Sequence, residues 1–291
     1  MSQAIPLLWF MFGMFMGACN DVWVRFLTRI PVTEISCFRF FFSLISLLPF
    51  VIRNKNIIKS EHKKIHFVRG VVFFLALTFW ELGVKNTQLS TATLIGFSTP
   101  FFLLIFSIYP LREKVTIPRI LATTISFIMI IGIVDFKNFS FGSSFVVLLF
   151  ASLLFAISDL LNKKYSTVDN HITAVLYYNI FAFLVSIPFM IHSFIKPSTI
   201  DIIYMFCLGV EANLYSYFLL KAFSVADASF LSPFKYFEFI FSIILGYIFF
   251  NEIPTYYNFA VIIVILTVNT LLFKYEKYKI TKKIQNKEKY I

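Results

Sequence analysis

The sequence predicts an all-α membrane protein with ten transmembrane helices, arranged as two inverted five-helix repeats. Of its 291 residues, 59% are hydrophobic and only 14% are charged, whereas soluble domains carry about 25% charged residues. Ten apolar stretches each have about the 20 residues that a helix needs to cross a bilayer. Basic residues also gather in alternate loops, as expected when those loops share one side of a membrane. The lipid bilayer is therefore the predicted surroundings of this chain.

The ten spans follow one another with short connections. The first lacks a basic region before it, which favours a retained helix over a cleaved signal peptide. Pro31, Pro118, Pro197 and Pro254 mark turns or first helical turns, where a missing N–H is harmless. The predicted spans are 5–27, 34–52, 67–84, 91–111, 117–134, 145–161, 172–192, 200–220, 229–250 and 257–273.

The distribution of Lys and Arg predicts the orientation. With the N-terminus inside, 19 of the 26 basic residues fall in inner segments and only four in outer loops. Both termini are therefore predicted to be cytoplasmic, with a basic tail at 276–291. The same asymmetry accounts for the net charge of +11 without nucleic acid as a partner.

A weak internal repeat divides the chain into halves. Residues 18–21 (Ala-Cys-Asn-Asp) resemble residues 156–159 (Ala-Ile-Ser-Asp), 138 positions later. Glu113 closes the fourth span, and Glu252 closes the ninth, 139 positions later. Because each half has an odd number of spans, the halves at 1–140 and 141–275 are predicted to be inverted, a common plan among transporters.

Charged residues inside the spans predict a binding site for a charged solute. Lys235 and Glu238 stand three residues apart in the ninth span, on one face of a helix. Charges at bilayer depth are costly and persist where they face protein or water. A basic residue there can hold a carboxylate, acidic residues can hold a cation or a coupling proton, and aromatic rings offer flat faces. The candidate substrate-binding residues are Asn20, Asp21, Arg39, Trp80, Glu81, Tyr177, Glu211, Lys235, Tyr236 and Glu238.

The alternative interpretation is that these side chains pair with one another between helices. Asp21 and Arg25, four residues apart, are such a pair. Asp159 is expected near the inner end of its span, where a helix-end contact is favoured over ligand contact. The four histidines fall in loops or at span ends and the three cysteines are isolated. We therefore expect no metal, no cofactor and no enzymatic activity.

These features resemble the drug/metabolite transporter superfamily of the EamA type, over about residues 5–275. A departure from the usual pattern is that Glu238 is followed by Phe239 instead of proline. A further set of segments resembles the S-adenosylmethionine uptake transporters of obligate intracellular bacteria. The segments are Asn20-Asp21-Val22, Phe38-Arg39-Phe40-Phe41-Phe42-Ser43, Asn162-Lys163-Lys164, Leu219-Leu220-Lys221-Ala222-Phe223-Ser224 with Asp227-Ala228, and Phe234-Lys235-Tyr236-Phe237-Glu238.

The resemblance implies a secondary transporter of the bacterial inner (plasma) membrane. It would import S-adenosylmethionine, with S-adenosylhomocysteine as an exchange partner, by alternating access. No phosphate-binding GxxxxGK[ST] loop is present, so the expected energy source is a gradient or a counter-substrate. The alternatives are an exporter of amino acids or other small metabolites, a membrane-embedded enzyme, and a channel.

Overall fold

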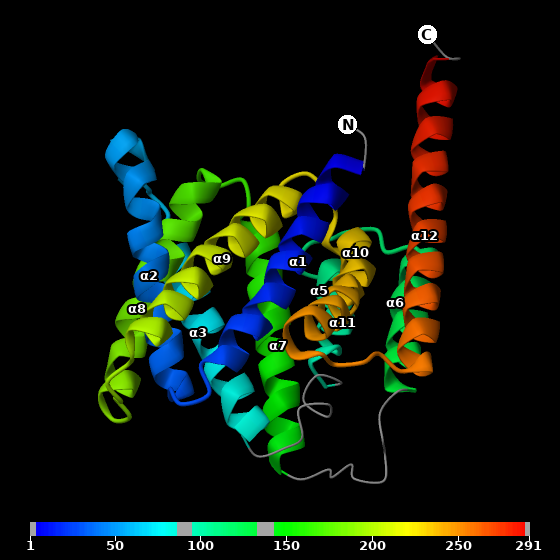
Figure 1. Ribbon diagram of the computed structural model, residues 1–291. Helices are drawn as coiled ribbons and strands as arrows, with labels where there is room; N and C mark the ends of the chain where they lie inside the picture. The colour runs from blue at the N-terminus through cyan, green and yellow to red at the C-terminus, as the bar shows by residue number, and fades with distance from the viewer. Residues whose placement is uncertain (1–3, 86–94, 133–142, 289–291) are drawn as a thin grey trace.

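Helices make up the regular structure of this protein in its computed structural model (Figure 1), which describes residues 4–85, 95–132 and 143–288. No strand occurs within those three ranges, so the predicted all-α class is confirmed for them. The elements are α1 (Ala4–Phe26), α2 (Val32–Arg53), the 3-10 helix η1 (Lys55–Ile58), α3 (Lys63–Lys85), α5 (Thr99–Ile108), α6 (Ile117–Ile131), α7 (Ser143–Lys164), α8 (His171–Ile191), α9 (Thr199–Phe223), α10 (Ala228–Leu231), the 3-10 helix η3 (Ser232–Tyr236), α11 (Phe237–Phe250) and α12 (Tyr256–Glu288).

Seven helical segments among the described residues are long and apolar enough to cross a membrane. They are α1, α2, α7, α8, α9, the α10–α11 segment and α12, while α5 and α6 are shorter apolar helices. The start of the predicted fourth span and the end of the fifth lie outside the described residues. Helix α1 begins and α12 ends at the same end of the bundle (Figure 1).

The helices pack in matching pairs. Helix α1 lies against α9 and α11, and α7 lies in the same way against α3 and α5. Helix α2 contacts α9, just as α8 contacts α3, while α2 also meets α8 and α6 meets α12. The contacts of α1 with α9 and α11, and of α2 with α9, thus have counterparts in those of α7 with α3 and α5, and of α8 with α3.

Two glycines allow two of these helix pairs to approach closely. A Cβ atom at Gly209 in α9 would lie 2.7 Å from the backbone nitrogen of Ser43 in α2. A Cβ atom at Gly70 in α3 would lie 2.8 Å from the carbonyl oxygen of Tyr178 in α8. The hydroxyl of Ser43 donates a hydrogen bond of 2.9 Å to the Gly209 carbonyl. The two glycines are 139 positions apart, the interval between Glu113 and Glu252.

The predicted ninth span is interrupted. A single helix over 229–250 was expected, whereas α10 and α11 are joined by the 3-10 turn η3. Pro233 is one reason, because proline has no N–H to donate to the carbonyl four residues back. The Ser232 hydroxyl donates to that carbonyl, on Ser229, at 3.3 Å. Lys235 therefore lies in η3, whereas Glu238 lies in the first turn of α11.

Polar contacts fix the start of α10. The Glu113 carboxylate accepts hydrogen bonds of 2.8 and 2.9 Å from the backbone N–H groups of Ala228 and Ser229, which a helix N-terminus leaves without internal partners. Arg119 donates to the Ser229 hydroxyl at 2.6 Å and pairs with buried Glu276 at 2.8 Å. Glu276 belongs to α12, which continues as one helix from the predicted tenth span into the predicted basic tail.

Candidate functional site

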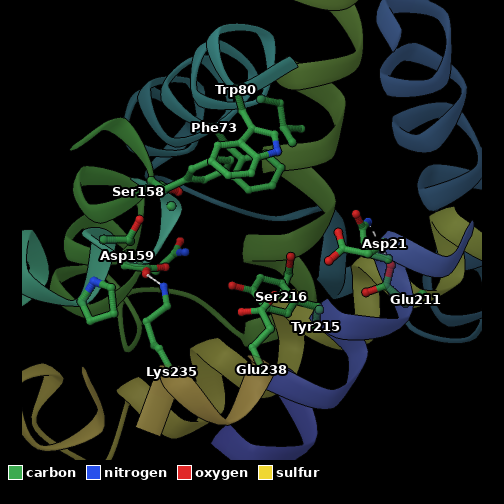
Figure 2. Close-up of a pocket in the computed structure, with 18 of the residues that line it drawn as sticks. Asp21, Phe73, Trp80, Ser158, Asp159, Glu211, Tyr215, Ser216, Lys235 and Glu238 are labelled. Carbon is green, nitrogen blue, oxygen red and sulfur yellow. Dashed lines mark hydrogen bonds and ion pairs between the residues drawn. The ribbon is translucent and has the colours of Figure 1, made fainter. Parts of the chain in front are cut away.

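A polar cavity lies between the helices, and seven charged side chains line it (Figure 2). Residues of α1, α2, α3, α7, α8, α9, η3 and α11 form its walls, together with residues around the start of α5. Its charged side chains are the cations Arg39, Arg69 and Lys235 and the anions Asp21, Asp159, Glu211 and Glu238. With all seven ionised, the cavity wall carries one negative charge in excess.

Lys235 is paired with Asp159, as Figure 2 shows. Its ammonium group donates to an Asp159 carboxylate oxygen, and both residues are buried. Asp159 was expected to make a helix-end contact, but it faces the cavity from α7. The partner of Lys235 thus comes from another helix and not from Glu238.

Three carboxylates lie on other parts of the wall. Figure 2 places Asp21 and Glu211 side by side, across the cavity from the Lys235–Asp159 pair, and Glu238 between these two groups beside Tyr215. The amide of Asn20 donates to Glu211 Oε2 at 3.2 Å, whereas buried Glu211 Oε1 has no hydrogen-bond partner among the described residues. Such unpaired oxygens can accept hydrogen bonds from a cationic group or offset its charge.

Gly17 in α1 makes room for the Glu238 carboxylate. A Cβ atom at position 17 would lie 2.8 Å from Glu238 Oε1. The absence of a side chain at this position therefore lets the carboxylate of α11 rest against α1.

Aromatic rings form another wall. Phe155 meets Phe73 with ring centroids 6.1 Å apart and Trp80 with centroids 6.3 Å apart, both edge to face. The Arg39 guanidinium carbon lies 5.7 Å from the Phe73 ring centroid. The Arg39 Nε atom is buried and has no hydrogen-bond partner in the described part of the chain. This wall can stack against a planar ring, and its arginine retains unused donors.

The cavity brings together most, but not all, of the predicted site residues. Those that line it are Asn20, Asp21, Arg39, Trp80, Glu211, Lys235 and Glu238. Tyr177 and Tyr236 do not line it. The Tyr177 hydroxyl donates to the Ile58 carbonyl at 2.6 Å, and that of fully buried Tyr236 donates to the Phe97 carbonyl at 3.3 Å. The side chain of Glu81 lies outside the described residues.

Sequence reasoning missed other residues of the wall, among them Arg69, Phe73 and Asp159. Two signals in the sequence point to them. Arg69, Phe73, Leu77 and Trp80 recur at helical spacing along α3, and all line the cavity. Asp159 lies 138 positions after Asp21, which is the interval of the internal repeat. The predicted site residue Asp21 therefore indicates Asp159 as its counterpart.

Arg25 has a different partner from the one expected. Its guanidinium donates to Glu252 at 2.6 Å and makes no ion pair with Asp21 among the described contacts. Arg25 thus joins the end of α1 to the connection between α11 and α12.

The chain belongs to the EamA-like transporter family, which matches it twice, over residues 4–135 and 142–273. With the seven candidate spans, this makes it a multi-pass membrane transporter, located in the bacterial inner membrane. A solved crystal structure matches with a TM-score of 0.81, covering 93% of this chain and 98% of the other. Its sequence is 13% identical, so it shows the fold alone.

Comparison with curated proteins identifies relatives whose substrates are named. An S-adenosylmethionine uptake transporter of Rickettsia bellii is 32% identical over 285 residues, or 97% of this chain and 98% of the relative. The protein of that name in Rickettsia prowazekii is 34% identical over 248 residues, or 84% of each chain. A pseudopaline exporter of Pseudomonas aeruginosa is 27% identical over 191 residues, or 64% of this chain and 66% of the exporter.

Proposed function

We propose that this protein imports S-adenosylmethionine across the inner membrane. The observation that carries the proposal is the 32% identity to an S-adenosylmethionine uptake transporter over 97% of the chain. The predicted motifs around Arg39, Lys235 and Glu238 point to the same substrate.

The charges of the cavity suit this ligand. S-adenosylmethionine carries a sulfonium, an ammonium and a carboxylate, so its net charge is +1. That charge would offset the one negative charge in excess that the cavity wall carries when all seven side chains are ionised. Glu238 and Asp21 would face the cationic part. Since Lys235 is already paired with Asp159, Arg39 is the better candidate of the two predicted cations for the carboxylate.

The adenine ring would lie on the aromatic wall, against Trp80. Tyr236 was the second ring expected beside the adenine, but it is fully buried and does not line the cavity. Phe73 takes its place in this proposal, because it lies near Trp80 and faces the cavity.

For the mechanism, we propose alternating access by two inverted halves, 1–140 and 141–275, with ten spans and both termini cytoplasmic. The repeated helix contacts, the glycines 139 positions apart and the two family matches support this arrangement. In such carriers the halves rock about a site at their interface. S-adenosylhomocysteine, which lacks the methyl group and the sulfonium charge, is the proposed exchange partner.

Uptake of labelled S-adenosylmethionine into proteoliposomes tests the proposal. We expect saturable uptake that unlabelled S-adenosylmethionine abolishes, and faster uptake when the vesicles are preloaded with S-adenosylhomocysteine. Empty vesicles are the control for leakage and surface binding. Uptake no greater than in empty vesicles would contradict the proposed import. Equal uptake with and without preloaded S-adenosylhomocysteine would contradict the proposed exchange.

The second candidate is an exporter of amino acids or other small metabolites. The similarity to a pseudopaline exporter favours it, at lower identity and coverage than the uptake transporters. Efflux of a preloaded metabolite panel, with no uptake of S-adenosylmethionine, would favour this candidate instead.

A further inference from the structure

Arg69 is a buried cation of the cavity wall that no carboxylate pairs with among the described residues. It is 3% exposed and lines the cavity from the first half of α3. The described ion pairs join Asp159 to Lys235, Glu252 to Arg25, Asp227 and Glu276 to Arg119, and Asp169 to His62 and His66. Arg69 has no direct ion pair among the described residues, because the Asp169 carboxylate lies beyond His66. A buried charge without a direct partner is costly, and a ligand can supply that partner.

Neutral acceptors hold the Arg69 guanidinium in position. Its Nε and Nη2 atoms donate to the Asn162 side-chain oxygen at 3.1 and 2.8 Å, and its Nη1 atom donates to His66 Nδ1 at 3.1 Å. Arginine has five N–H donors, so two remain. Its orientation is fixed, while part of its hydrogen-bonding capacity stays available to the cavity.

His66 is itself oriented by a second residue. Because arginine can only donate, His66 Nδ1 accepts, and the ring proton lies on Nε2. That N–H donates to Asp169 at 2.8 Å. Burial acts to raise the pKa of Asp169, but hydrogen bonds from Ser60 and His66 outweigh it and lower this pKa. A charged Asp169 thus holds a neutral His66, whose free nitrogen fixes the arginine.

Arg69 also shares a helix face with the aromatic wall. Phe73 and Leu77 follow it at intervals of one turn, and Trp80 completes the cavity-lining stripe. Arg69 and Trp80 are separated by about 16 Å along the helix axis, at 1.5 Å per residue. An elongated ligand with a flat ring at one end and an anion at the other matches this stripe.

We propose that Arg69 binds the carboxylate of the substrate's amino-acid portion, so that the cavity selects ligands that carry a carboxylate beside their cationic groups. This inference rests on the proposed function and adds to it a specificity-determining residue. A guanidinium recognises a carboxylate through parallel charge-assisted hydrogen bonds. Arg69 thereby replaces Arg39 as the proposed partner of the carboxylate. Arg39, which contacts the Phe73 ring, contributes a second positive charge to the cavity wall.

Binding to the purified full-length protein tests the inference, by thermal-shift titration with S-adenosylmethionine and with its decarboxylated analogue. We expect the intact protein to bind the carboxylate form at least about tenfold more tightly, as loss of a charge-assisted hydrogen bond implies. In Arg69→Gln, the ratio of the two affinities should fall to within about twofold. Lys64→Gln, an exposed position on the same helix, should keep the full ratio.

Two results would overturn the inference: equal binding of both ligands by the intact protein, or an unchanged ratio in Arg69→Gln. If Arg69→Gln does not fold, Arg69→Lys decides, because lysine cannot reproduce the planar fork. An unchanged ratio in Arg69→Lys counts against the inference and a lowered ratio supports it. Since this assay measures binding, its failure differs from that of the proposed import: vesicles can take up S-adenosylmethionine while the ratio is unaltered, or fail to do so while Arg69 still sets the ratio.

Discussion

At the scale of single residues, we expect the Lys235–Asp159 ion pair to stabilise the fold as well as to line the cavity. Both partners are buried and belong to different helices, η3 and α7. Removing one partner of a buried ion pair leaves the other charge uncompensated, whereas replacing both by apolar side chains of similar volume is often nearly neutral. The contribution of Lys235 to binding therefore has to be measured together with its effect on stability.

We expect Lys235→Ala to destabilise the protein by about 3–5 kcal/mol, because it strands the Asp159 carboxylate. The double variant Lys235→Ala/Asp159→Ala should recover part of that loss, because no charge is left unpaired, although both side chains are shortened. Chemical or thermal unfolding in detergent measures both, with exposed Lys64→Ala as the matched control. Additive losses in the double variant would contradict a pairing of these two residues.

Site residues were predictable from the sequence where a charged side chain interrupts an apolar span. They were less predictable where the rotation of a helix decides which side chain faces the cavity. Lys235 and Glu238 stand out in an apolar span, and both line the cavity. The partner of Lys235 was not predictable from local spacing, because it lies 76 positions earlier in the chain. Tyr177 was proposed, whereas its neighbour Tyr178 lines the cavity. A shift of one residue turns a helical side chain by about 100°.

At the scale of elements, the close contacts of α2 with α9 and of α3 with α8 depend on glycine residues, which have no side chain. Gly209 and Gly70 lie against backbone atoms, which cannot move aside as the end of a flexible side chain can. A methyl group at either position would push two helices apart. These helices also carry Arg39, Glu211 and Arg69, so the spacing of the bundle and the shape of the cavity are linked.

We expect Gly209→Ala and Gly70→Ala each to cost about 1–3 kcal/mol of stability through overpacking. Gly13→Ala is the matched control, since a Cβ atom there would meet its nearest neighbour in α9 at 3.7 Å, an ordinary contact. The melting temperatures of the three variants test whether the close helix contacts cause the loss of stability. If Gly13→Ala lost as much stability as the other two, the close crossings would not be the cause.

The order of the helices was largely predictable, because apolar length reports membrane spans directly. The break in the ninth span was not predicted, although Pro233 was visible. Proline is tolerated within membrane helices when neighbouring groups satisfy the freed carbonyl, and here the Ser232 hydroxyl does so. The position of a helix break thus depends on contacts with neighbouring side chains, which a hydropathy profile does not describe.

At the scale of the whole molecule, residues from both segments that match the family, 4–135 and 142–273, line one cavity, and these segments fall in the two proposed halves. Asp21 and Arg39 come from the first half, and Lys235 and Glu238 from the second. Neither half alone holds the full set of charges. A relative movement of the halves would therefore change the distances between the charges that face the substrate, which is what alternating access requires.

The proposed exchange of a +1 ligand for a neutral one, in a cavity whose wall carries one negative charge in excess when all seven charged side chains are ionised, has an electrical consequence. Moving one elementary charge across the membrane potential changes the free energy by about 2.3 kcal/mol per 100 mV. A carrier loaded with a +1 ligand would be neutral at the cavity, whereas one loaded with neutral S-adenosylhomocysteine would keep its negative charge. Each exchange would then carry one positive charge inward, and an inside-negative potential would drive it.

We accordingly expect a potassium diffusion potential, inside negative and set by valinomycin, to accelerate uptake of S-adenosylmethionine into vesicles preloaded with S-adenosylhomocysteine. Reversal of the potassium gradient should slow it. Equal rates in both gradients would mean that the exchange is electroneutral. The charge difference between the two substrates would in this way let the transporter draw on the electrical gradient that the membrane already maintains. The negative cavity would place the voltage-dependent step in the return of the carrier with S-adenosylhomocysteine.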